Sequence, residues 1–78
     1  MLISLLKNMK EKNGNYMTIQ QAILAMRIGC KIRADWMRGD LYYYIQGNAI
    51  HASDDWANFM SINRFAQLFD NSHNWYIV

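Results

Sequence analysis

The 78-residue sequence contains no proline, a single cysteine and no long run of apolar residues. One cysteine cannot form an internal disulfide, so Cys30 is expected to be a small, reduced, apolar side chain in a reducing compartment. Residues 1–12 lack both the long apolar core and the small-residue cleavage site of a signal peptide. The sequence therefore predicts a cytoplasmic protein rather than a secreted disulfide scaffold.

Side chains that carry out catalysis or bind metals are equally scarce. His51 and His73 have no partner at metal-ligand spacing, and the adjacent Asp54 and Asp55 would point to opposite sides of a strand. The four glycines stand singly, so no glycine-rich phosphate loop is present. We therefore expect no enzyme activity, no metal and no cofactor.

Aromatic residues are abundant by comparison, and charge is modest. Aromatic side chains make up 14% of the chain, and three of them are tryptophans, too many for all to be buried in so short a chain. The formal charge of +2 is weak for a protein that binds duplex nucleic acid. Because a chain of this length buries only about 60–65% of its unfolded surface, self-association is a natural way to complete the core.

The clearest local pattern is a helix, a glycine and a strand. Thr18 and Gln21 have the spacing of a capping box, and Gly29 can end the helix in the left-handed conformation. Residues 30–34 then alternate as in a half-buried strand. The helix is indicated by apolar residues at i, i+3, i+4 and i+7: Ile19, Ala22, Ile23 and Met26.

The remaining patterns predict a single α+β domain over residues 17–78, preceded by an amphipathic helix and linker over 1–16. Its sheet is antiparallel, with four or five strands and two or three short helices on one face. Gly47-Asn48 is a two-residue hairpin turn, and Ser61 caps the second helix of this domain. The expected strands are 41–46, 49–53, 57–60 and 75–78, and the second helix is 62–69.

The helix–glycine–strand unit resembles a known family, the second class of Thoeris anti-defence proteins, which are small phage proteins. The resemblance continues through the aromatic segment 41–45 and the final segment 74–78, where Asn74 replaces the aspartate that family members commonly carry. It rests first on Ala22, Gly29, Lys31, Ile32, Arg33 and Trp36.

This resemblance implies a protein that acts in the host cytoplasm as a sponge. Such proteins bind an immune signalling nucleotide, for instance a cyclised ADP-ribose derivative, without cleaving it. Related sponges take cyclic dinucleotides made by cyclic-oligonucleotide (CBASS) defence systems. They assemble as homo-oligomers with pockets at or near subunit interfaces. The resemblance thus predicts a cyclic nucleotide as the partner, with no membrane and no duplex nucleic acid.

Residue types near the middle of the chain suit a nucleotide site. Stacking is assigned to Trp36, Tyr42 and Tyr44, phosphate contact to Arg33 and Arg38, and a reserve contact to Trp56. The structural alternative is that the tyrosines form cross-strand pairs and Trp36 anchors the core.

Three other functions remain open. The aromatic surface could serve a protein-binding inhibitor of a bacterial defence nuclease, of the anti-CRISPR type, because some relatives are reported as anti-CRISPR proteins. Single-stranded nucleic acid is a second possibility, and a lipid surface contacted by residues 1–12 is a third.

Overall fold

The computed structural model describes residues 16–78, which form one sheet and two helices. The predicted N-terminal helix and linker, residues 1–16, lie almost wholly outside the described residues. In chain order the elements are α2 (Ile19–Arg27), β1 (Ile32–Ala34), β2 (Tyr43–Gln46), β3 (Ala49–Ala52), β4 (Asp55–Ser61), α3 (Ile62–Leu68) and β5 (Trp75–Ile77).

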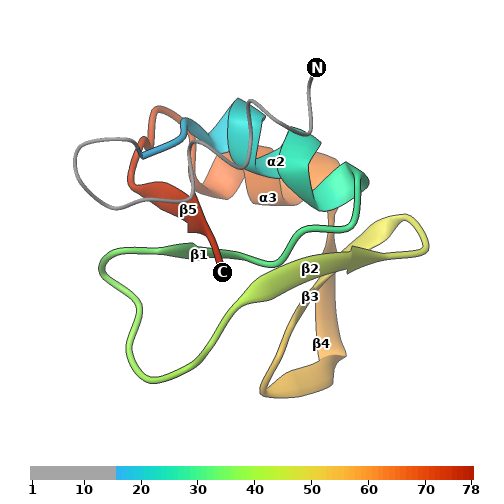
Figure 1. Ribbon diagram of the computed structural model, residues 1–78. Coiled ribbons are helices and arrows are strands. Elements are labelled where there is room, and N and C mark those ends of the chain that lie inside the picture. Colours follow the sequence, from blue (N-terminus) through green and yellow to red (C-terminus); the bar gives the residue numbers. More distant parts are fainter. Residues whose placement is uncertain (1–15) are drawn as a thin grey trace.

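The five strands form an antiparallel sheet in the order β4-β3-β2-β1-β5. Both α2 and α3 lie on the same side of this sheet (Figure 1). The α+β class, the antiparallel sheet and its helix-covered face are therefore as the sequence predicted. Neither helix of the described residues, 16–78, lies on the opposite face of the sheet.

Local sequence determines both ends of α2. The Thr18 hydroxyl accepts a hydrogen bond from the Gln21 amide at 3.2 Å, and the Gln21 side chain accepts one from the Thr18 amide at 2.9 Å. At the other end, Gly29 adopts a φ of 98°. The amides of Gly29 and Cys30 donate to the carbonyls of Met26 and Ala25, which is the Schellman arrangement. The helix direction is thus fixed where the chain enters β1.

Turn chemistry likewise fixes the register of the β2–β3 hairpin. Gly47 has a φ of 65°, as the first residue of a two-residue turn often requires. Gln46 therefore pairs with Ala49, and Tyr44 with His51. Since paired residues share a face of the sheet, this register decides which aromatic side chains meet.

Trp75 lies at the centre of the core between the helices and the sheet. It is fully buried, and its ring contacts those of Tyr43, Phe65 and Phe69. Its backbone forms an isolated bridge with Met17, which covers the outer edge of β5. The other fully buried large side chains are Phe65, Met17, Ile19, Met26, Ile32 and Ile50.

The strand that follows the second turn is longer than the predicted segment 57–60. The turn occupies residues 53–54, and β4 begins at Asp55, which pairs with Ala52. The register then shifts, so that His51 pairs with Phe59. Three residues of β4, 56–58, therefore bulge outward, which places Trp56 at the sheet surface.

Candidate functional site

A row of aromatic rings crosses the sheet face opposite α2 and α3. Tyr43 packs against Phe65 of α3, so its neighbour Tyr44 points to the opposite face. Across the strands, Tyr44 pairs with His51 and His51 with Phe59. We call this row, together with Trp56, the outer aromatic face.

His51 is the buried centre of the outer aromatic face, with only 4% of its surface exposed. Its ring is nearly parallel to those of Tyr44 and Trp56, with centroids 5.5 and 5.2 Å away. Its Nδ1 lies 2.8 Å from the carbonyl oxygen of Trp56. Because a carbonyl oxygen can only accept, Nδ1 carries the hydrogen. The imidazole therefore holds the bulge of β4 against β3.

Trp56 is exposed and yet held in place. The residue is 58% exposed, and its Nε1 donates to Oε1 of Gln46 at 2.8 Å. Phe59 beside it is equally exposed. A stacked and hydrogen-bonded indole loses little side-chain entropy when a partner binds it.

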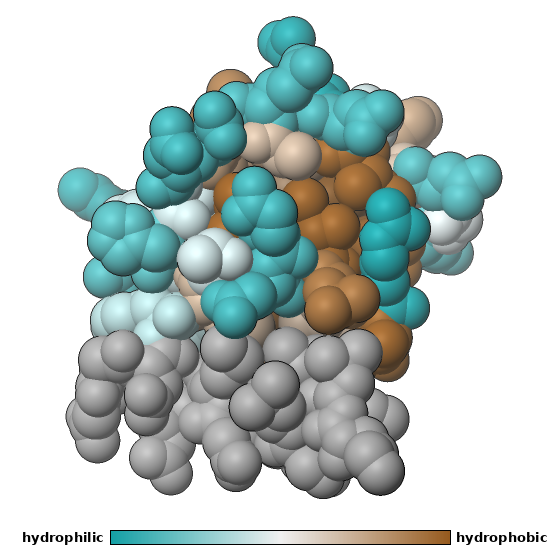
Figure 2. Space-filling view, turned by 90° about the horizontal axis from the view of Figure 1, so that it is seen from above, coloured by the Kyte–Doolittle hydropathy of each residue, from teal (hydrophilic) through white to brown (hydrophobic). Residues whose placement is uncertain are grey.

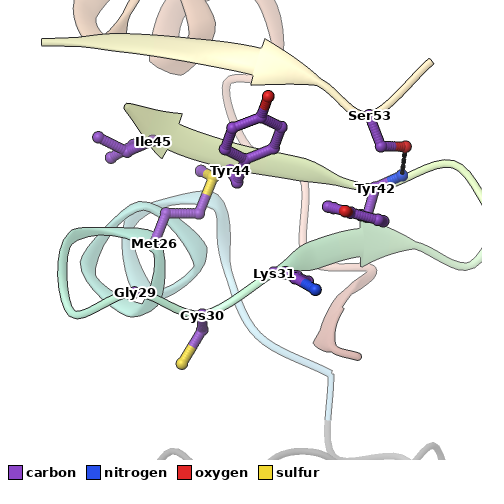
Figure 3. Close-up of a pocket in the computed structure, with 8 residues that line it drawn as sticks. All are labelled: Met26, Gly29, Cys30, Lys31, Tyr42, Tyr44, Ile45 and Ser53. Carbon is purple, nitrogen blue, oxygen red and sulfur yellow. Dashed lines mark hydrogen bonds between the residues drawn. The ribbon is translucent and has the colours of Figure 1, made fainter. Parts of the chain in front are cut away.

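A pocket of about 270 Å³ opens where β1 and β2 separate. These strands pair only through Ile32 and Tyr43, so the sheet is open beyond that pair. Figure 3 shows the tyrosines of the β2 segment on one side and the chain that leaves α2 on the other. The lining residues are Met26, Gly29, Cys30, Lys31, Tyr42, Tyr44, Ile45 and Ser53.

The chemistry of this pocket favours a planar group that carries negative charge. The rings of Tyr42 and Tyr44 lie 6.0 Å apart, and Nζ of Lys31 lies 5.1 Å from the centre of the Tyr42 ring. Among the lining residues within 16–78, Lys31 is the one charged side chain, and none is a carboxylate. Aromatic faces stack on bases, and an ammonium group binds phosphate as a point charge.

Comparison of this chain with protein-family models, with curated proteins and with solved structures found no match. Within residues 16–78, no helix has the length and apolar character needed to cross a bilayer. The same residues contain no group of three or more histidine, cysteine or acidic side chains that could hold a metal ion. The site is therefore interpreted from its own geometry.

Arg33, predicted to contact phosphate, is engaged inside the protein. Its Nη1 donates to the carbonyls of Gly39 and Leu41, and its Nη2 donates to the carbonyl of Met37 at 2.6 Å. Its Nε is buried and has no hydrogen-bond partner among the residues that the structure describes. Three of the five N–H donors of Arg33 are therefore used within the protein, and Lys31 is the cation that lines the pocket.

The other predicted site residues fall in separate places. Tyr42 and Tyr44 line the pocket, whereas Trp56 stacks on His51 and is not among the lining residues. Trp36 is 53% exposed and stacks on Phe69 at 5.8 Å, at the edge of the core. Arg38 lies exposed in the connection between β1 and β2. The structure thus brings together two of the six predicted residues in the pocket.

Sequence reasoning did not assign most of the pocket lining, nor His51 and Phe59 of the outer aromatic face. Three of these unassigned residues carry a hydroxyl, ammonium or imidazole group. Ser53 and Lys31 line the pocket, and His51 supports the aromatic rings. The positions of His51 and Ser53 could have been predicted from the Gly47-Asn48 turn. This turn fixes the pairing of Tyr44 with His51 and places Ser53 opposite Tyr42. The position of Lys31 could not have been predicted in this way, because its contact with Tyr42 depends on how β1 and β2 separate.

Proposed function

We propose that this chain is a non-enzymatic binding protein that sequesters a nucleotide, with a cyclic nucleotide second messenger as its ligand. The observation that carries the proposal is the pocket at the opening between β1 and β2. It combines two tyrosine faces with the ammonium group of Lys31 and contains no carboxylate. A phage counter-defence role in the host cytoplasm follows from the family resemblance described above.

The size of the pocket limits what one chain can enclose. Its 270 Å³ lies below the range of about 300–1,000 Å³ typical of sites that enclose a drug-sized ligand. The pocket therefore accommodates one base or one phosphate-bearing unit of a cyclic nucleotide. The rest of the ligand would lie over the outer aromatic face or against another subunit.

The affinity that sequestration requires also leads us to expect a homo-oligomer. Sequestration requires binding near the nanomolar range, which corresponds to about −12 kcal/mol. One base stacked on an aromatic ring contributes about 1–3 kcal/mol, which leaves most of the binding free energy to be supplied by further enclosure. The helix layer also retains exposed apolar side chains at Leu24, Ile28 and Leu68, and a hydrophobic area lies among hydrophilic side chains on that side of the molecule (Figure 2).

The proposal is tested by native mass spectrometry of the full chain mixed with cyclic ADP-ribose, cyclic di-AMP and cyclic GMP-AMP. We expect an oligomer that retains one of these nucleotides intact.

Lys31→Gln should weaken binding about tenfold or more, because a charge-assisted hydrogen bond contributes about 1.5–3 kcal/mol. Arg64→Gln is the matched control, since Arg64 is exposed on α3 and lies outside the pocket lining. Equal affinity of both variants would remove Lys31 from the site, and cleavage of the nucleotide would exclude sequestration.

A second function, inhibition of a bacterial defence nuclease by protein binding, is favoured by one observation. Trp56 and Phe59 are both 58% exposed, and Trp56 is immobilised by His51 and Gln46. Exposed and preorganised tryptophans are typical of the central contacts of protein interfaces. If Trp56→Ala abolished a stable protein complex while no nucleotide was retained, this function would replace the first.

A further inference from the structure

We infer that Arg33 is a positioning residue, which shapes the connection between β1 and β2 and thereby orients Tyr42 in the pocket. The binding role of Tyr42 in this inference rests on the proposed function. The shaping of the connection by Arg33 rests on the hydrogen bonds of Arg33 alone. It assigns to Arg33 a role different from the phosphate contact predicted by the sequence.

The connection folds around the guanidinium group. The three carbonyls that accept from Arg33 belong to residues 37, 39 and 41, so alternate peptide units of one short segment turn toward the same side chain. Gly39, in the middle of this segment, has a φ of 63°, which lets the chain bend there. One side chain of β1 therefore determines the path of the backbone that leads into β2.

The peptide unit between Leu41 and Tyr42 is the point at which this effect reaches the pocket. Its carbonyl accepts from Nη1 of Arg33 at 3.0 Å, and its amide donates to Oγ of Ser53, also at 3.0 Å. A peptide plane held on both edges cannot rotate, and the Cα of Tyr42 is attached directly to it. Figure 3 shows the Ser53 bond beside the Tyr42 ring, on the side of the pocket that faces Lys31.

The geometry requires arginine rather than any cation. A guanidinium group is planar and presents its N–H groups in a fixed fork, whereas an ammonium group is a compact point charge on a flexible stem. Two nitrogens of the fork donate to three carbonyls spread along the segment, whereas the three donors of a lysine share a single nitrogen. Lysine at this position would keep the charge near the pocket and lose the shape that holds the connection.

The experiment compares full-length Arg33→Lys, Arg33→Ala and Ser53→Ala with the wild type by hydrogen exchange and by nucleotide titration. We expect amide exchange over residues 38–42 to accelerate about tenfold in both Arg33 variants, with protection in β2 and β3 retained. Added N-ethylguanidinium should restore slow exchange to Arg33→Ala. Ser53→Ala, which frees the same peptide from its other side, should accelerate exchange at Tyr42. Arg64→Ala is the control for loss of a positive charge.

The affinity arm uses cyclic ADP-ribose and cyclic di-AMP as probes. Arg33→Lys should bind whichever nucleotide the wild type holds about tenfold more weakly, although its charge is unchanged. Wild-type-like exchange and affinity in Arg33→Lys would overturn the inference, and so would a folded Arg33→Ala that N-ethylguanidinium fails to rescue. A wild type that binds neither probe would count against the proposed function alone, because the exchange measurement needs no ligand.

Discussion

Tyr43 and Tyr44 are neighbours in β2 whose phenol groups lie in different surroundings. Tyr44 lies in the outer aromatic face, whereas Tyr43 packs against Phe65 of α3. Burial raises the pKa of Tyr43 above its ordinary value of 10.0, and the negative charge of Asp54 raises it further. Both causes disfavour the phenolate in the folded protein.

This pKa shift predicts a loss of stability at high pH. The folded state holds the Tyr43 proton more tightly than the unfolded state does, so the contribution is complete below pH 10 and is lost as the pH rises through the raised pKa. Urea unfolding at pH 8 and at pH 11 should show a larger decrease in the free energy of unfolding for the wild type than for Tyr43→Phe. Equal decreases for the two proteins would contradict the assignment.

At the scale of elements, α2 illustrates how capping residues position the pocket. The capping box at Thr18 begins the helix, and the Schellman arrangement at Gly29 ends it. Both termini matter for the site, because Met26, Gly29 and Lys31 all line the pocket. A frayed α2 would displace this side of the pocket from the tyrosines.

Replacement of the capping residue tests this contribution. Thr18→Ala should lower the free energy of unfolding by about 1 kcal/mol, because the amide of Gln21 loses its acceptor. Thr18→Ser keeps a hydroxyl at the same place and should remain near the wild type. Thermal or urea unfolding of the three proteins measures the difference, and equal stability of all three would show that the cap is not needed.

Local sequence patterns in residues 17–26 and 46–49 predicted α2 and the β2–β3 hairpin. The Thr18–Gln21 spacing, the apolar stripe and the turn at Gly47 all act within a few residues, so they fixed α2 and the hairpin correctly. The predicted gap between strands 49–53 and 57–60 is instead a two-residue turn at 53–54, and β4 starts at Asp55. Its bulge follows from contacts with His51 in the neighbouring strand, which no local pattern in 53–61 contains.

For the whole molecule, Trp75 and Trp56 differ in their contribution to the fold, because one lies in the core and the other at the surface. Trp75 is completely buried and joins the sheet to α3, whereas Trp56 is 58% exposed on the outer aromatic face. A large aromatic residue in the core typically contributes about 3–5 kcal/mol, which is comparable with the total stability of about 5–15 kcal/mol of a domain. The core of this small fold therefore depends heavily on one side chain.

A matched pair of substitutions tests that difference. Trp75→Ala should lower the free energy of unfolding by at least about 3 kcal/mol and unfold much of the protein at ambient temperature. Trp56→Ala should retain the fold, because it removes one surface stack and one hydrogen bond. Circular dichroism during urea unfolding measures both. A severe loss in Trp56→Ala would show that the outer aromatic face is part of the folding core.

By itself the sequence determined the α+β class, both helix caps and the β2–β3 register, because each follows from interactions within a few residues. Only the tertiary structure decided which residues line the pocket and which are engaged elsewhere in the protein. It turned the donors of Arg33 onto three backbone carbonyls, and it placed Lys31 beside Tyr42 at the opening between β1 and β2. An arginine has the same donors for a ligand and for a carbonyl, and which acceptors it meets depends on groups that only the folded chain brings together.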